Sequence, residues 1–200
     1  AHAVGHPASS FFVYQQVYDK NGVPLEGVYV DRNGDGKINN ADKYFYKSPM
    51  APWTAGFTSK VQYKQWDFGF SLRASIGNYV YNDLEGSSAN VSTVFSKGFL
   101  SNRPTYSLQP RWTTDDNAFS DRFVQNGSFL RMENITLGYS FENLLKGARY
   151  EGINGRLYVT ASNVFTLTKY KGLDPDVFGG IDNNVYPRPF SILAGVSLNF

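Results

Sequence analysis

The sequence predicts an all-β protein, strands of an antiparallel transmembrane β-barrel with long extracellular loops, and three observations lead to this fold class. Several segments alternate apolar and polar residues with a period of two, so each strand has one apolar and one polar face. Aromatic residues make up 16% of the 200 residues, which favours strands over helices. Short and long connections alternate along the chain, as periplasmic turns and extracellular loops do in such barrels.

Five strands have a clear alternation, and a sixth near the start has an ambiguous one. In Trp66–Ile76 the even positions are apolar and the odd positions are polar or small. The last segment repeats this pattern, with one leucine on its polar face. In chain order, the predicted strands are Ser10–Tyr18, Ala55–Tyr63, Trp66–Ile76, Phe129–Phe141, Gly155–Phe165 and Phe190–Phe200.

Four polar residues fall on the apolar side of these strands. Ser59 and Asn163 each interrupt an otherwise apolar face, Asn163 near one end of its strand. Arg131 and Glu133 fall on the apolar side of the first half of their strand. Because a charge is costly in the hydrocarbon, we expect these two residues to lie beyond it.

The connections set the orientation. Lys64–Gln65 is a two-residue turn, and residues 142–154 form a moderate link with a possible helical turn at Glu142–Gly147. The other connections are long, about residues 19–53, 77–128 and 169–188. If the short connections are periplasmic and the long ones extracellular, the C-terminus lies on the periplasmic side.

Aromatic residues gather at both predicted membrane surfaces. Tyr63 and Trp66 flank the short turn, and Phe141 and Phe200 end strands on the same side. Trp53 and Phe165 mark the opposite rim, as in the aromatic girdles of membrane barrels. A soluble β-sandwich with an aromatic core stays open as an alternative.

Composition narrows the possible functions. Lys plus Arg (19) nearly balances Asp plus Glu (17), so no charge bias points to nucleic acid. The chain has no cysteine and two histidines, His2 and His6, which leaves little material for zinc or thiol chemistry. The sequence has no catalytic triad, zinc spacing or phosphate-binding glycine loop, so we do not expect an enzyme.

The segment 31–42 has the spacing of a calcium loop. Oxygen ligands stand at positions 1, 3 and 5, a glycine at 6, a backbone carbonyl at 7 and a carboxylate at 12. The predicted ligands of a structural Ca²⁺ or Mg²⁺ ion are Asp31, Asn33, Asp35, the carbonyl of Lys37, and Asp42. The alternative is a turn that is stabilised by hydrogen bonds from side chains to the backbone.

Other candidate residues are weaker. Asp115 and Asp116 resemble a carboxylate pair for glycoside hydrolysis, but adjacent carboxylates in a polar loop are usually solvated. Three cations on the polar faces either touch a substrate or simply avoid lipid, and three loop aromatics either stack on sugars or pack the loops. The cations are Lys60, Arg73 and Arg156, and the aromatics are Tyr106, Trp112 and Tyr170.

Four stretches of sequence carry a resemblance to a known family. They are VGHP at Val4–Pro7, VDRNGDGKINNADK at Val30–Lys43, NGSFLRMENITLGYSF at Asn126–Phe141, and Gly155–Phe200 with GRLYVTASNVFTLTKYKGLDPDV and YPRPFSILAGVSLNF. In order and spacing they resemble the C-terminal end of SusC/RagA-type, TonB-dependent outer-membrane transporters of Bacteroidetes. The resemblance covers nearly the whole chain.

The resemblance implies a large barrel in the outer membrane of a Gram-negative bacterium, with an N-terminal plug. Since five or six strands cannot close a barrel, we expect a fragment that lacks the plug, the TonB-contacting segment and the N-terminal strands. The family imports oligosaccharides, or peptides, with a SusD-like surface lipoprotein and with TonB. Two other interpretations stay open: a soluble calcium-binding carbohydrate module, and a barrel that serves as a structural subunit of an assembly.

Overall fold

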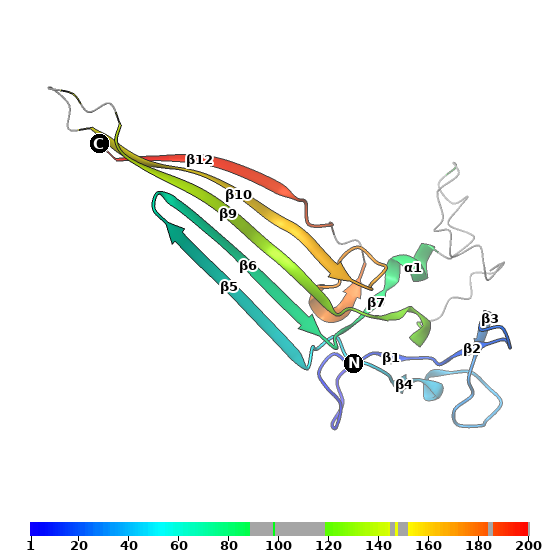
Figure 1. Cartoon of the computed structure of the whole chain (residues 1–200). Helices are drawn as coiled ribbons and strands as arrows, with labels where there is room; N and C mark the ends of the chain where they lie inside the picture. Colours follow the sequence, from blue (N-terminus) through cyan, green and yellow to red (C-terminus); the bar gives the residue numbers. More distant parts are fainter. Residues whose placement is uncertain (89–97, 99–118, 145–146, 148–151, 184–185, 200) are drawn as a thin grey trace. The chain divides into compact units, whose positions relative to one another are not determined.

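The computed structural model describes residues 1–88, 98, 119–144, 147, 152–183 and 186–199 (Figure 1). The chain divides into two compact units, which we call the strand unit and the loop unit. The strand unit comprises Trp53–Ile76, Phe129–Thr168 and Pro187–Phe200. The loop unit comprises Ala1–Pro52, Gly77–Ser128 and Lys169–Tyr186.

The strand unit is one antiparallel sheet of five strands, in the order β12-β10-β9-β6-β5. The long ribbons lie side by side in Figure 1. Their bounds are β5 Trp53–Tyr63, β6 Trp66–Ile76, β9 Phe129–Leu144, β10 Ile153–Thr168 and β12 Ser191–Asn199. All five clearly alternating segments are therefore strands, and β6 has the predicted bounds.

The register keeps apolar residues opposite apolar residues. Leu137 of β9 lies between Phe68 of β6 and Val159 of β10, and Val159 lies opposite Ala194 of β12. This face is open, since Val159 is 49% exposed and Leu137 is 48% exposed. An extended and exposed apolar face is what a lipid-facing barrel wall requires, whereas a sandwich core would be buried.

All three long connections join the same end of the sheet. Trp53 lies opposite Ile76, and Phe129 lies opposite Thr168, so these strand termini lie at the same end of the sheet. At the other end, Lys64 takes a positive φ of 54° in the predicted two-residue turn. Asn199 pairs with Asn154 at that end too, so the C-terminal strand finishes on the side of the short turn.

A β-bulge corrects the predicted position of Arg131 and Glu133. The register shifts between Ser71 and Leu72 of β6, so Glu133 is an extra residue that has no opposite partner there. Arg131 then lies opposite Arg73, on the polar face. The predicted apolar facing of Arg131 and Glu133 was wrong, because a bulge reverses the facing of the residues on one side of it. Their position beyond the hydrocarbon stays a prediction.

Asn163 belongs to the same irregularity, in β10. The register of β10 against β9 shifts between Ser162 and Phe165, and Asn163 has a φ of 53°. Asparagine tolerates this left-handed conformation better than most residues. Its amide donates to the carbonyl of Pro189 at 2.9 Å, which explains why a polar residue interrupts the apolar pattern.

The loop unit contains short strands and single helical turns. The strands are β1 Phe12–Val13 with β4 Tyr44–Phe45, β2 Gln16–Tyr18 with β3 Pro24–Tyr29, and the three-stranded sheet β11 Ile181–Asp182, β7 Tyr79–Asn82 and β8 Val124–Asn126. The helical elements are η1 Asn40–Asp42, α1 Asp83–Ser88, η4 Asp121–Phe123 and η5 Phe178–Gly180. Five buried residues form its core: Phe11, Val13, Tyr81, Phe123 and Val124.

Two predicted elements differ from the structure. The segment Ser10–Tyr18 is no sixth strand of the large sheet, because it divides into β1 and β2, which pair within the loop unit. The helical turn predicted at Glu142–Gly147 is wrong at its start, since β9 continues to Leu144; residues 145–146 lie outside the described residues. Within the described ranges, no helix has both the length and the apolarity needed to cross a bilayer.

Candidate functional site

The polar face of the sheet is centred on an ion pair that spans three strands. Arg156 of β10 donates from Nε to Asp67 Oδ1 at 2.8 Å and from Nη2 to Oδ2 at 2.6 Å. Both groups reach across Gly138 of β9, where a Cβ atom would collide with them. Because glycine has no side chain, Arg156 can form a bidentate ion pair with Asp67 across β9. Arg156 lies on the polar face, as predicted.

A hollow of about 250 Å³ lies beside this pair, on the half of the sheet next to the short turn. Thr58 and Ser71 bond each other at 3.1 Å at its floor. Lys60 lies on this wall, as predicted, and has no ion-pair partner among the described residues. The lining residues are Thr58, Ser59, Lys60, Asp67, Gly69, Phe70, Ser71, Asn134, Thr136 and Arg156. Hydroxyls, an amide and charged groups together suit a polar solute or hydrated surface.

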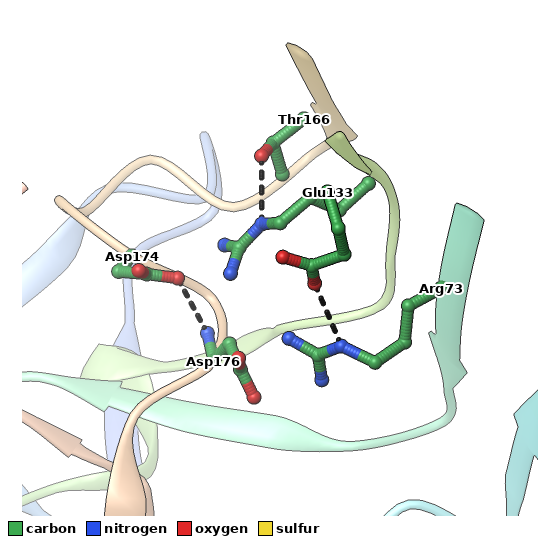
Figure 2. A network of polar contacts seen from close by, with 6 residues as sticks. Arg73, Glu133, Thr166, Asp174 and Asp176 are labelled. Carbon is green, nitrogen blue, oxygen red and sulfur yellow. Dashed lines mark hydrogen bonds and ion pairs between the residues drawn. The ribbon is translucent and has the colours of Figure 1, made fainter. Parts of the chain in front are cut away.

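A second polar cluster lies near the opposite end of the same face (Figure 2). Arg73 donates to Glu133 at 2.8 Å, and Arg131 donates to the Thr166 hydroxyl at 2.9 Å. Both guanidinium groups also lie about 5 Å from the Phe129 ring, at 5.1 Å and 5.0 Å. Because two like charges directly opposite each other are unfavourable, the bulge places Glu133 where its charge offsets one of them.

Sequence reasoning placed Arg73 on this face but missed its partner. Glu133 has the wrong parity for the polar face until the bulge is known. The signal in the sequence was the pair of charged residues at alternate positions of a strand that is otherwise apolar on that side. Figure 2 also shows Asp174 of the loop unit, whose carboxylate accepts from the Asp176 N–H at 2.9 Å.

The apolar face has a larger hollow of about 620 Å³. Its rim includes Trp66 and Tyr139, whose ring centroids lie 4.9 Å apart near the short turn. Its lining residues are Trp66, Leu137, Gly138, Tyr139, Leu157, Tyr158, Val159, Ala194, Gly195 and Val196. The chemistry of this lining suits acyl chains, with aromatic rings at the membrane surface, and offers little to a polar substrate.

The predicted cation loop folds around its own carboxylates. Asp31 accepts the N–H groups of Gly34 at 2.7 Å and Gly36 at 2.8 Å, one on each oxygen. Asp35 accepts the Lys37 N–H at 2.8 Å. Gly36 has a φ of 77°, in keeping with the sharp turn expected there. Among the described residues, no three His, Cys, Asp or Glu side chains are grouped to hold a metal, so the bonds agree with the turn alternative and the ion stays a prediction.

Asp42 lies inside this loop and accepts hydrogen bonds from its backbone. It is fully buried, and its oxygens accept the N–H groups of Arg32 at 2.9 Å and Asn39 at 2.8 Å. The hydrogen bond from the Asn39 N–H is the main reason that the pKa of Asp42 lies below its usual value; those from Arg32 and Asn33 add to it, and burial opposes it. A carboxylate held this firmly is a structural anchor of the loop.

Tyr170 is the one predicted loop aromatic that the structure describes. Its hydroxyl donates to Asp182 at 2.8 Å, and the residue is 7% exposed. Burial, then the bond to Asp182, raise the pKa of this phenol. Tyr170 therefore packs the loop unit and presents no open face to a sugar. Tyr106, Trp112, Asp115 and Asp116 lie outside the described residues.

Comparison with known proteins now decides the family. No family model matches the chain. It is 53% identical over 202 aligned residues to the TonB-dependent receptor SusC of Bacteroides thetaiotaomicron, in an alignment that covers 100% of this chain and 20% of SusC. The chain belongs to the SusC/RagA family of TonB-dependent outer-membrane transporters.

A further relative is also a TonB-dependent receptor, and the solved structures that resemble the chain are those of a transporter. The TonB-dependent receptor P3 of Formosa agariphila is 32% identical over 162 residues, 78% of this chain and 16% of P3. The structure of the RagAB peptide transporter matches 96% of this chain and 22% of its own, with 25% identity and a TM-score of 0.72. The RagAB peptide importer in the open-open state gives a TM-score of 0.70. The chain spans about a fifth of the length of the SusC relative.

Family membership gives the sheet its context. In the described part, β12 and β5 each pair on one side only, so the sheet is not closed. A barrel fragment explains both open edges and the exposed apolar face. The relatives reported above are named as receptors and transporters.

Proposed function

We propose that the strand unit is part of the wall of a TonB-dependent importer, with its polar face toward the aqueous lumen and its apolar face toward lipid. The observation that carries this proposal is the division of the sheet into two continuous faces. The apolar row that includes Leu137 is open, and the polar face is bridged by the Asp67–Arg156 pair. Import moves a solute through the lumen without making or breaking bonds in it.

The substrate of the whole protein is an oligosaccharide in this proposal, and a peptide is the second candidate. The RagAB structures are titled as a peptide importer and a peptide transporter, but this chain is only 25% identical to them. Its identity to SusC is 53%. The hydroxyl and amide groups of the polar hollow are chemically suited to sugar hydroxyls.

The proposal includes orientation and partners. The long connections face the cell exterior, and the short turn and the C-terminus face the periplasm. A SusD-like surface lipoprotein covers the extracellular side, and TonB acts through a region outside this chain. The loop 31–42 holds a structural Ca²⁺ or Mg²⁺ ion, with Asp31, Asn33, Asp35, Asp42 and the Lys37 carbonyl as ligands.

Cysteine labelling of the full-length protein in outer membranes tests the assignment of the two faces. This chain has no cysteine, so a single introduced thiol gives a clean signal within it. We expect Thr136→Cys, on the polar face, to react with a water-soluble maleimide. Its neighbour Leu137→Cys, on the apolar face, should react only with a lipid-soluble reagent. The reverse result, or equal labelling, contradicts the proposal.

Growth experiments test the transport step. A strain that lacks the full-length protein should lose growth on the imported oligosaccharide and keep growth on its monosaccharide units. Complementation with the wild-type gene should restore growth. Unchanged growth on both, together with a disturbed outer-membrane assembly, would instead support a structural subunit.

A further inference from the structure

The loop unit carries a row of tyrosine rings and cations. Arg32 lies 4.5 Å from the centroid of the Tyr44 ring, and the Tyr44 and Tyr46 rings are 5.7 Å apart. The Lys47 ammonium lies 5.5 Å from the Tyr46 ring and 5.0 Å from the Tyr79 ring. We call these five residues the tyrosine row.

The backbone places the row in a fixed position. Tyr44 belongs to β4, and the N–H of Tyr46, the first residue after β4, donates to the Phe11 carbonyl at 3.0 Å. The Tyr44 hydroxyl donates to Asp121 Oδ2 at 2.8 Å, and the Gln16 N–H donates to the other oxygen at 3.0 Å. These two hydrogen bonds connect β4 and β2 to η4, so the row is already ordered in the absence of a partner.

Among the described residues, the two cations of the row form no ion pair. Arg32 donates to the neutral Gln15 side chain at 3.0 Å, and no carboxylate among the described residues forms an ion pair with Arg32 or Lys47. Lys43, nearby in the sequence, lies 4.9 Å from the Tyr14 ring and has no ion pair in those residues either. A surface of this kind is complementary to carboxylates.

The arrangement also decides between a sugar and a protein as the occupant. A sugar ring needs the open face of an aromatic ring, but Arg32 covers Tyr44, and Lys47 lies over Tyr46 and Tyr79. Tyr46 is 39% exposed, and the Tyr44 hydroxyl is already bonded to Asp121. Tyrosine and arginine are enriched in protein–protein interfaces, where they act as anchors.

We propose that the tyrosine row docks an acidic surface of the lipoprotein partner. This inference rests on the proposed function, because it needs the long connections to face the cell exterior and a lipoprotein to cover them. Cation–ring contacts hold the two positive groups in place, so little side-chain entropy is lost on binding. Acidic groups of the partner then complete the ion pairs that this chain leaves open.

The test uses the full-length protein with its own lipoprotein partner in detergent. The double charge reversal Arg32→Glu/Lys47→Glu should weaken the complex at least ~10-fold at low salt, since like charges then face each other. The control reversal Lys20→Glu/Lys64→Glu changes the net charge equally at two exposed cations outside the row, and it should bind as the wild type does. Raising the salt concentration should weaken the wild-type complex more than that of the row variant.

The outcomes separate this inference from the proposed function. If the wild type does not bind a lipoprotein at all, the proposed partner is wrong, and the docking surface is wrong with it. If the wild type binds and the row variant binds equally well, or the control loses as much, only the docking surface is wrong. Loss of substrate import with an intact complex would make the row a substrate site and overturn the inference. Should the reversal fail to fold, Arg32→Gln/Lys47→Gln tests the same charges, with a smaller loss expected.

Discussion

The two units of this chain differ in the exposure of their apolar side chains. In the strand unit Val196 is 59% exposed and Phe57 is 58% exposed, whereas in the loop unit Val13 and Phe123 are 0% and 1% exposed. The strand unit holds its strands together through long backbone ladders and keeps apolar side chains outside. The loop unit has strands of two to six residues around a small apolar core.

This contrast shows that one chain is adapted to two solvents. An apolar side chain that faces lipid is in an apolar environment, so its position outside the protein costs little free energy. The strand unit therefore needs no apolar core of its own. In the loop unit, the burial of apolar side chains away from water must offset the conformational entropy that is lost when irregular segments become ordered. The same substitution should therefore have different effects in the two units, and four experiments test this, from the largest expected effect to the smallest.

Removing the largest fully buried side chain described in the loop unit should have the largest effect. Phe123→Ala leaves a cavity beside Tyr81, 5.9 Å from it between ring centroids, and should cost about 3–5 kcal/mol. We expect the loops to become sensitive to protease while the barrel resists heat and detergent as before. Phe57→Ala, an exposed ring on the apolar face, is the matched control. Equal protease sensitivity of both variants would show that the units do not differ in this way.

The second largest effect should come from a charge that is placed on the apolar face of the strand unit. Leu137→Lys puts an ammonium on the apolar face and should cost ~2–4 kcal/mol if it lies at the bilayer midplane. Thr136→Lys, one residue earlier on the polar face, should be tolerated. The amount of heat-modifiable barrel in outer membranes measures both. Equal loss from the two variants would contradict the assignment of the faces.

The sequence predicted the strand unit well because its signal is local. Alternation with a period of two needs no knowledge of partners, so the five main strands and the faces of Lys60, Arg73 and Arg156 followed from it. The bulge at Glu133 did not, since an extra residue is visible only against the register of neighbouring strands. The partnership of Asp67 with Arg156 also depends on register, because 89 residues separate them.

The loop unit was hard to predict for the opposite reason. Its core joins Val13 to Phe123 and Tyr81, which are far apart in the sequence and show no periodic pattern. The segment Ser10–Tyr18 resembled one more strand of the barrel, because its alternation is compatible with either unit. The calcium-loop spacing did predict a tight turn around Asp31, but spacing alone does not distinguish a metal site from a turn closed by its own N–H groups.

The ion pair of the polar face should make a moderate contribution to stability. Arg156→Gln leaves the Asp67 carboxylate, whose side chain is 11% exposed, without its charged partner beside Gly138. Because the Arg156 side chain is 36% exposed, solvent screening reduces the expected loss in the free energy of unfolding to about 1 kcal/mol. The double variant Asp67→Asn/Arg156→Gln should lose less than the sum of the single variants in barrel unfolding by urea. Simple additivity would show that the two groups do not interact.

The smallest expected effect is the pH dependence of the loop 31–42 in the loop unit. The folded pKa of Asp42 lies below the usual value of 3.8, mainly because the Asn39 N–H bonds to it. The stability that it contributes is complete above about pH 4, and it is lost as the pH falls through the folded pKa. Hydrogen exchange from about pH 6 to about pH 3 should show residues 31–42 opening before the β6–β9 ladder does. Asp42→Asn should open the loop already at neutral pH and flatten this acid dependence, since an amide cannot accept on both sides. An unchanged acid profile in Asp42→Asn would mean that another group anchors the loop.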